Sequence, residues 1–125
     1  MKKVCIIEDE VNLSEMYKIL FEQEGYEVRC AFDGESGLKL IEEYKPDLVL
    51  LDIMLPKKDG LAVLKELSDD RKKKVGQIVM LTNLGQEAVV QEGFTLGAVG
   101  HLVKSALAPD QVLTEVSRFL AHEQS

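Results

Sequence analysis

The chain has 125 residues, of which 46% are hydrophobic and 30% are charged, and its formal net charge is −7. We expect one domain over residues 1–125, long enough to bury a substantial core and with the composition of a soluble globular protein. The acidic balance argues against direct nucleic-acid binding, because the one clear basic run, Arg71–Lys74, is short and is predicted to be a solvated loop.

The sequence does not predict export or a membrane span. The apolar run Val4–Ile7 near the N-terminus is too short for the core of a signal peptide. Cys5 and Cys30 are too few for a disulfide framework and lie in apolar, strand-like segments, so we predict buried, reduced thiols. We therefore expect a cytoplasmic protein.

Five short apolar runs recur along the chain at intervals of roughly 25 residues. Four of them are short aliphatic runs, which is typical of strands buried in a parallel sheet, whereas the second alternates only loosely between apolar and polar residues. The runs are Val4–Ile7, Glu27–Phe32, Leu48–Leu51, Ile78–Leu81 and Ala98–Val103.

A segment with apolar residues at helical spacing follows each run. The first is predicted to start at an N-cap, Asn12, with Glu15 completing a capping box, and to end at Gly25. The second starts after Asp33–Gly34 and stops at Lys45–Asp47. The third helix has Leu61, Leu64 and Leu67 on one face, and the fourth is predicted near Gln86–Phe94. The last helix has Pro109 in its first turn and a continuous apolar stripe of Val112, Leu113, Val116, Phe119 and Leu120.

The helix over Gln86–Phe94 has the least favourable composition, because it contains β-branched Val89 and Val90 and an interior Gly93. Even so, strands and helices alternate five times. Repeated βαβ units with right-handed crossovers form a parallel sheet with helices on both faces, so we predict a doubly wound α/β domain.

Polar side chains follow four of the five predicted strands. They are Glu8 and Asp9 after the first, Asp52 after the third, Thr82 after the fourth and Lys104 after the fifth. Because the carboxyl ends of parallel strands meet at one edge of the sheet, we expect these groups to lie close together.

The residue types at this edge predict a particular chemistry. Three neighbouring carboxylates repel one another, and a hard divalent cation relieves the repulsion; oxygen ligands without histidine or cysteine favour Mg²⁺ or Mn²⁺. The Thr82 hydroxyl and the Lys104 ammonium are groups that bind phosphoryl oxygens. Together they predict phosphoryl transfer, with Asp52 as the nucleophile that forms an aspartyl-phosphate.

Four motifs carry a family resemblance: Ile7–Glu10, Asp52–Pro56 with Asp59–Gly60, Leu81–Thr82, and Gly97–Ala98 with Lys104. In combination they resemble the receiver domains of two-component response regulators, over essentially the whole chain. The resemblance implies a flavodoxin-like fold with strand order 2-1-3-4-5. It also implies that Asp52 accepts phosphate from a histidine kinase or a phosphotransfer protein.

For the metal, the resemblance implies that Asp9, Asp52 and the backbone carbonyl of Met54 ligate Mg²⁺, with Glu8 acting mainly through water. For the phosphoryl group, it implies contacts from Lys104, the Thr82 hydroxyl and the backbone N–H of Asn83. Thr82 then couples to a surface made by the fourth helix, the fifth strand and the fifth helix, where His101 holds the switch position.

Several positions depart from the common receiver pattern. Receivers usually have Tyr or Phe at the place of His101, which is either a partly exposed strand residue that keeps some ring contact or part of a pH-sensitive output face. A proline usually follows the lysine through a cis bond; Ser105 stands here, where a cis bond costs about 2.5–4 kcal/mol. The residue after the threonine is usually small in receivers, whereas here it is Asn83.

Met54 and Leu84 flank the predicted acceptor and are apolar, so neither can orient the water that hydrolysis needs. We therefore predict slow autodephosphorylation. Beyond this and the self-catalysed phosphotransfer onto Asp52, we expect no enzymatic activity.

Other readings compete with this one. A dinucleotide-binding domain would need a glycine-rich turn after the first strand, and an aspartate phosphatase usually carries its nucleophile there and needs a cap. A receiver-like module that works without phosphorylation is the main alternative. The downstream partner, a missing output domain, and the choice between a monomer and a phosphorylation-dependent dimer stay open.

Overall fold

Five parallel strands form one sheet in the computed structural model, which describes residues 1–69, 76–83 and 85–122. The basic run Arg71–Lys74 and Leu84 lie outside the described residues. The strands are β1 (Lys3–Ile7), β2 (Glu27–Ala31), β3 (Leu48–Asp52), β4 (Gln77–Thr82) and β5 (Gly100–Val103). Their order is β2-β1-β3-β4-β5, so the predicted flavodoxin-like topology is confirmed.

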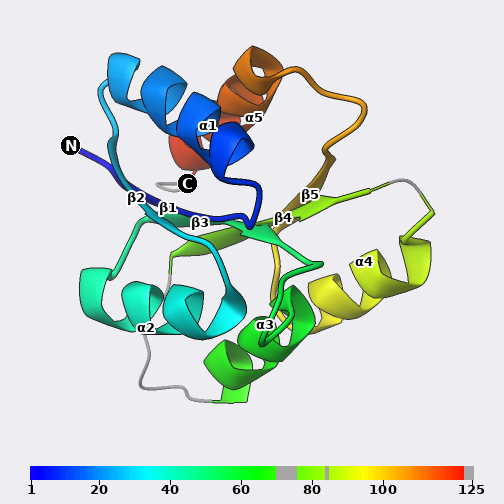
Figure 1. Ribbon diagram of the computed structural model, residues 1–125. Helices are drawn as coiled ribbons and strands as arrows, with labels where there is room; N and C mark the ends of the chain where they lie inside the picture. Colours follow the sequence, from blue (N-terminus) through cyan, green and yellow to red (C-terminus); the bar gives the residue numbers. More distant parts are fainter. Residues whose placement is uncertain (70–75, 84, 123–125) are drawn as a thin grey trace.

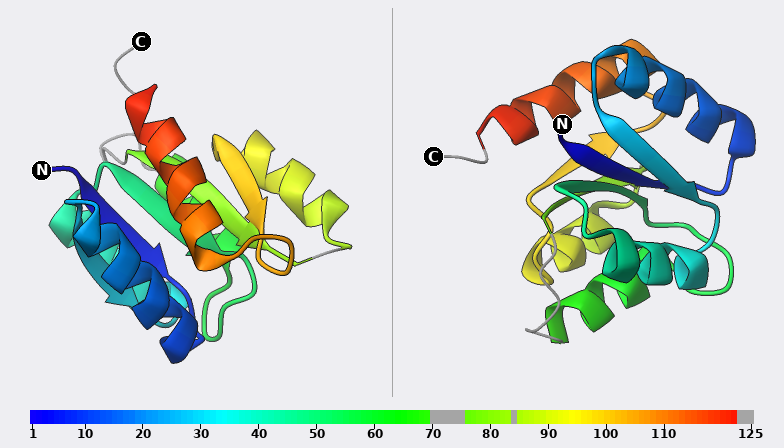
Figure 2. Two further views of the ribbon diagram at one scale, coloured as in Figure 1. Left: turned by 90° about the horizontal axis from the view of Figure 1, so that it is seen from above. Right: turned by 90° about the vertical axis from the view of Figure 1, so that its left-hand side faces the viewer.

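Five helices alternate with the strands and cover both faces of the sheet (Figure 1). They are α1 (Val11–Gln23), α2 (Gly34–Tyr44), α3 (Gly60–Asp69), α4 (Glu87–Thr95) and α5 (Pro109–Ala121). α1 and α5 lie on one face, and α2, α3 and α4 lie on the other; the views in Figure 2 show the same two layers.

The core has two halves, one on each face of the sheet. Alternate residues of a strand point to opposite faces, so Val4 and Ile6 pack with α1 and α5, whereas Cys5 and Ile7 pack with α2 and α3. β3 lies at the centre of the sheet and is buried along its whole length, which explains its unbroken apolar run. This central strand ends at Asp52.

The predicted capping box at Asn12 is wrong, because α1 begins one residue before it with Glu10 as its N-cap. The Glu10 carbonyl accepts the first helical hydrogen bond, from the Ser14 N–H at 2.9 Å. The Glu10 N–H is itself bound by the buried carboxylate of Glu8 at 3.0 Å. A tertiary contact therefore fixes the start of the helix, and local sequence does not.

Other boundaries differ from the predictions by one or two residues. β2 ends at Ala31 and β5 begins at Gly100, whereas the sequence predicted Phe32 and Ala98. Cys5 is buried as predicted, but Cys30 is only partly buried. Packing accounts for the unfavourable Gly93 in α4, because a Cβ there would lie 2.1 Å from the sulfur of Met80.

Candidate functional site

The register of the sheet brings the predicted polar residues to one edge. β1 and β3 end level with each other, since Ile7 pairs with Leu51. β3 and β4 are level through Asp52 and Leu81, and β4 and β5 are level through Thr82 and Val103. Each residue of the predicted set is therefore the last of its strand or one of the next two.

Three carboxylates gather at this edge. Glu8, Asp9 and Asp52 each offer an oxygen atom, and these oxygens all lie within 4.8 Å of one another. Glu8 and Asp52 are buried, whereas Asp9 is exposed. The cluster therefore has two carboxylates inside the protein and one at the surface, where an ion can arrive.

Lys104 is the cation of the cluster. Its Nζ lies 2.8 Å from Asp52 Oδ2 and 2.9 Å from Glu8 Oε2. Burial alone would lower the pKa of Lys104, but its hydrogen bonds to Asp52 and Glu8 outweigh burial and raise that pKa. Lys104 is thus charged and joins β5 to both β1 and β3.

Glu8 has the most perturbed carboxyl group of the site. Burial raises its pKa to about 7, since a desolvated carboxylate is disfavoured, and the neighbouring Asp52 adds to the rise. The Glu10 N–H and Lys104 oppose the rise without cancelling it. One ammonium does not neutralise three carboxylates, so the site carries an excess of negative charge.

The carboxylate of Asp52 is held by hydrogen bonds at both oxygens. Oδ1 accepts the N–H of Met54 at 2.9 Å, and Oδ2 accepts from Lys104. These bonds fix the orientation of the side chain. Met54, whose backbone N–H makes one of these contacts, is itself 59% exposed.

Thr82 closes the site on the side of β4. Its hydroxyl is buried and has no hydrogen-bond partner in the structure. A buried hydroxyl gains from a hydrogen bond, so Thr82 offers a donor to a group that reaches the end of β4. The next residue, Asn83, donates its backbone N–H to the side chain of Gln86.

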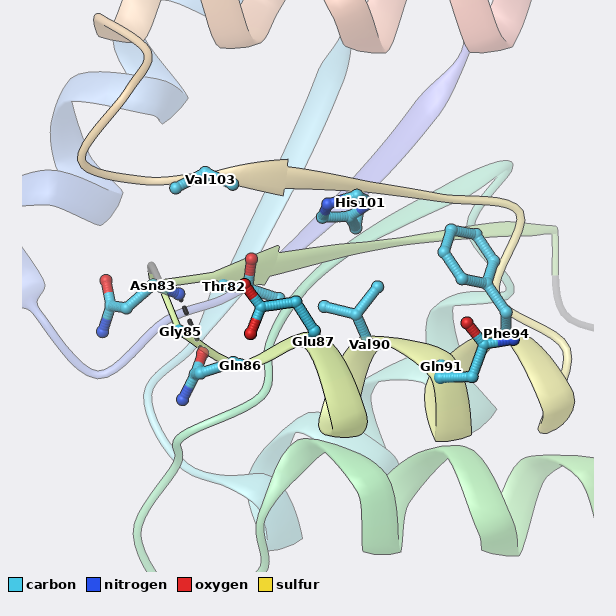
Figure 3. A pocket seen from close by; sticks show the side chains of 10 residues that line it. All are labelled: Thr82, Asn83, Gly85, Gln86, Glu87, Val90, Gln91, Phe94, His101 and Val103. Carbon is cyan, nitrogen blue, oxygen red and sulfur yellow. Dashed lines mark hydrogen bonds between the residues drawn. The ribbon is translucent and has the colours of Figure 1, made fainter.

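His101 lies apart from the carboxylates. It is exposed on β5, and its ring meets Phe94 of α4 edge to face, with 5.9 Å between the ring centroids. These two residues, Val90 and Thr82 help to line a groove of about 320 Å³ between α4 and β5 (Figure 3). His101 is thus an exposed strand residue with a ring contact, and both its place as the switch residue and its part in a pH-sensitive output face stay predictions.

The family of the chain follows from a comparison of its sequence. A family model described as the response regulator receiver domain matches residues 4–117. The chain belongs to this family. The match spans the five strands except Lys3, and most of α5, so the receiver assignment covers the site and nearly all of the sheet.

Solved structures agree with this assignment. A CheY-like receiver domain protein from Methanospirillum hungatei JF-1 is 26% identical, with a TM-score of 0.88 over 99% of this chain and 97% of that one. The chemotaxis protein CheY4 of Vibrio cholerae is 29% identical, with a TM-score of 0.84 over 95% and 98%. The receiver domain of the Francisella response regulator 1452 is 26% identical, with a TM-score of 0.84 over 97% and 98%.

The acidic cluster of this receiver domain could hold a metal ion. Three carboxylates are the donor set that a hard divalent cation such as Mg²⁺ prefers, and their excess charge is what such an ion neutralises. Asp9 is the exposed ligand candidate, and Asp52 and Glu8 are the buried ones. The role predicted for the Met54 carbonyl stays a prediction.

Two features of the receiver domain were not anticipated from the sequence. Gln86 binds the backbone of Asn83 at 2.8 Å, and Phe94 contacts His101. The first had no standard sequence signal, because Gln86 is the N-cap of α4 and its side chain reaches back to a residue before the helix, unlike the N3 acceptor of a capping box. The second had none either, since it depends on how α4 packs on β5.

The Lys104–Ser105 peptide bond is trans, as are all the peptide bonds of the described residues. This answers the question that the sequence left open about Ser105. Over the same residues, no helix of the receiver domain is both long and apolar enough to cross a membrane.

Proposed function

We propose that this receiver domain is a phosphoacceptor, in which Asp52 takes a phosphoryl group from the phosphohistidine of a kinase or a phosphotransfer protein. The observation that carries the proposal is the environment of Asp52. Its carboxylate is buried, oriented by Met54 and Lys104, and accompanied by Glu8 and Asp9 within 4.8 Å. A structural aspartate does not need two further carboxylates beside it, because their repulsion is unfavourable.

The transfer itself is a single displacement at phosphorus. An oxygen of Asp52 attacks, a new O–P bond forms, and the N–P bond of the phosphohistidine breaks. The electron pair of that bond returns to the imidazole, which carries a proton on its other ring nitrogen and therefore leaves as neutral histidine. Receiver residues contribute by position and charge, which is the main source of catalysis in phosphoryl transfer.

Each neighbour of Asp52 has a separate part in this proposal. Lys104 stays paired with the transferred group and balances its charge, and the Thr82 hydroxyl donates the hydrogen bond that it lacks in the unmodified protein. Asp9 and Glu8, with Asp52, would hold Mg²⁺ or Mn²⁺, which supplies positive charge to the phosphoryl oxygens when bound. Asn83 offers its backbone N–H.

We infer that the modified state is read on the face made by α4, β5 and α5. Thr82 lines both the phosphoryl site and the groove that His101 and Phe94 border, so a shift of Thr82 changes the groove directly. The kinase and the downstream partner are expected to be proteins of the same signalling system, and the expected compartment is the cytoplasm.

Beryllofluoride with Mg²⁺ tests the proposal, because it forms a stable mimic of an aspartyl-phosphate. We expect ¹⁵N chemical-shift changes centred on Asp52, Thr82 and Lys104 in the wild type, and none in Asp52→Asn. Asp33→Asn is a matched control, since Asp33 is a capping residue that lies outside the acidic cluster. It should respond like the wild type.

A receiver-like module that docks on partners without phosphorylation predicts the opposite outcome. In that case beryllofluoride would leave the spectra of all three proteins unchanged. Incubation with acetyl phosphate and Mg²⁺ gives a second readout, because transfer adds one phosphoryl group that intact-protein mass spectrometry detects on the wild type and not on Asp52→Asn.

A further inference from the structure

Gln86 makes a contact that the proposed function does not explain. Its Oε1 accepts the backbone N–H of Asn83 at 2.8 Å (Figure 3). Gln86 is also the N-cap of α4, and its own carbonyl accepts the N–H of Val90 at 2.9 Å. One side chain therefore joins the end of β4 to the first turn of α4.

The N–H that Gln86 binds is directed toward the side of β3. The carbonyl of Thr82 belongs to the same peptide unit and accepts the N–H of Lys104 at 2.8 Å, so it points toward β5. In a trans peptide the carbonyl and the N–H point in opposite directions. The Asn83 N–H therefore points away from β5, and the strand on that side of β4 is β3, which ends at Asp52.

We propose that Gln86 is a positioning residue that competes with the phosphoryl group for the Asn83 N–H. The proposal rests on the phosphoacceptor function of Asp52. In the unmodified protein Gln86 holds this donor, whereas the Thr82 hydroxyl beside it is free. A phosphoryl group on Asp52 takes both donors, and the Asn83–Gln86 bond breaks.

Breaking this bond transmits the change to α4. Gln86 loses its link to β4, and its side chain, which lines the groove between α4 and β5, becomes free to move. The first turn of α4 then depends on helical bonds alone, because no side chain caps it. Modification of Asp52 thereby loosens the start of α4, independently of any movement of His101.

The chain offers a matched control for this bond. At the start of α5, Gln111 Oε1 accepts the backbone N–H of Ala108, also at 2.8 Å and also three residues apart. The bond has the same chemistry, but it lies at the start of another helix and involves no residue of the acidic cluster. Gln111→Ala thus removes an equivalent contact without touching the proposed competition.

The first experiment examines the bond without any ligand. In Gln86→Ala we expect the Asn83 amide proton to shift upfield and to exchange faster with solvent, whereas Gln111→Ala should change Ala108 and leave Asn83 as it is. An Asn83 amide that is the same in wild type and Gln86→Ala would show that the contact is absent in solution and would overturn the proposal.

The second experiment measures the affinity for beryllofluoride in the presence of Mg²⁺. Gln86→Ala should bind about fivefold more tightly than the wild type, which corresponds to one hydrogen bond that no longer has to be broken. Gln86→Glu should bind more weakly, because a carboxylate holds the N–H more strongly and repels the anion. Gln111→Ala should match the wild type.

The outcomes separate the two proposals. If the wild type binds beryllofluoride and Gln86→Ala binds no more tightly, the competition is wrong and the phosphoacceptor function stands. If none of the four proteins binds it, Asp52 is not a phosphoacceptor, and the role of Gln86 is wrong with it.

Discussion

Glu8 is a residue of the site whose ionisation the fold alters strongly. Its pKa is about 7 in the folded protein and 4.5 for an ordinary glutamate, chiefly because it is buried. Between these two pH values the Glu8 carboxyl group binds more protons in the folded protein than in the unfolded chain. Stability therefore falls as the pH rises through this window, which is the opposite of the usual behaviour of a paired carboxylate.

Glu8→Gln should remove this dependence. In a chelator, the free energy of unfolding of the wild type should fall as the pH rises from 4.5 to 7, because Glu8 holds its proton more tightly in the folded state than in the unfolded chain. Urea denaturation at several pH values would measure it. A variant whose pH dependence over this window equals that of the wild type would contradict the role given to burial.

We predict that Met54 influences how long a phosphoryl group would survive at Asp52. Met54 lies two residues after the acceptor, and its exposed side chain cannot hydrogen-bond a water molecule. Met54→Asn supplies such a group, so we expect the half-life of the aspartyl-phosphate to shorten about fivefold, as one hydrogen bond to the attacking water would give. Leu84→Glu is predicted to act in the same direction.

The decay of the phosphorylated protein, followed by mass spectrometry, checks this expectation. Met54→Leu is the control, since it changes the shape of the side chain and adds no polar group. Equal half-lives for wild type, Met54→Asn and Leu84→Glu would refute the idea that the apolar flanks slow hydrolysis.

At the scale of elements, the start of α3 packs closely on the end of β3. A Cβ on Gly60 would lie 2.6 Å from the carbonyl oxygen of Asp52 and 2.7 Å from the Cα of Ile53. Both are backbone atoms at the end of the central strand, and they cannot relieve a clash by changing rotamer as a side chain can. Gly60 also donates its N–H to the Ile53 carbonyl at 2.9 Å, so α3 and the acceptor strand are in direct contact.

Gly60→Ala should therefore destabilise the protein by about 1–3 kcal/mol, the usual cost of overpacking, and should displace the backbone of Asp52. Lys65→Ala, on the exposed face of the same helix, is the control and should stay within about 0.5 kcal/mol of the wild type. Thermal denaturation and the beryllofluoride titration together measure both effects. Wild-type stability in Gly60→Ala would mean that α3 can move away at no cost.

Much of the molecule could be predicted at the level of elements, and the reason is periodicity. The unbroken apolar run of β3 and the polar residues after four strands indicate a buried parallel sheet and its functional edge without any tertiary information. The start of α1 could not be predicted, because a hydrogen bond from the Glu10 N–H to the buried Glu8 fixes it. The packing of Phe94 on His101 has no local signal either.

At the scale of the whole molecule, the sheet concentrates negative charge at one point of an already acidic protein. The chain carries a formal net charge of −7, and three of its carboxylates lie within reach of one ion. Binding of a divalent cation to the folded state alone must stabilise that state, because the unfolded chain disperses the three carboxylates.

We expect Mg²⁺ at ten times its dissociation constant to stabilise the wild type by about 1.4 kcal/mol. Asp9→Asn should lose most of this gain; Asp9 is exposed, so its replacement leaves the core intact. Asp33→Asn should keep the gain. Thermal denaturation with Mg²⁺ and with a chelator checks the expectation, and equal stabilisation of Asp9→Asn and wild type would place the ion elsewhere.

The ion pair between Lys104 and Glu8 joins residues that are 96 positions apart in the chain. Contacts of such long range form only after most of the intervening loops have closed, so the cluster is assembled late in folding. A chain still emerging from the ribosome has Asp52 but not Lys104. Asp52 and Glu8 therefore lack their cationic partner until the residue that follows β5 has been synthesised and β5 has joined the sheet.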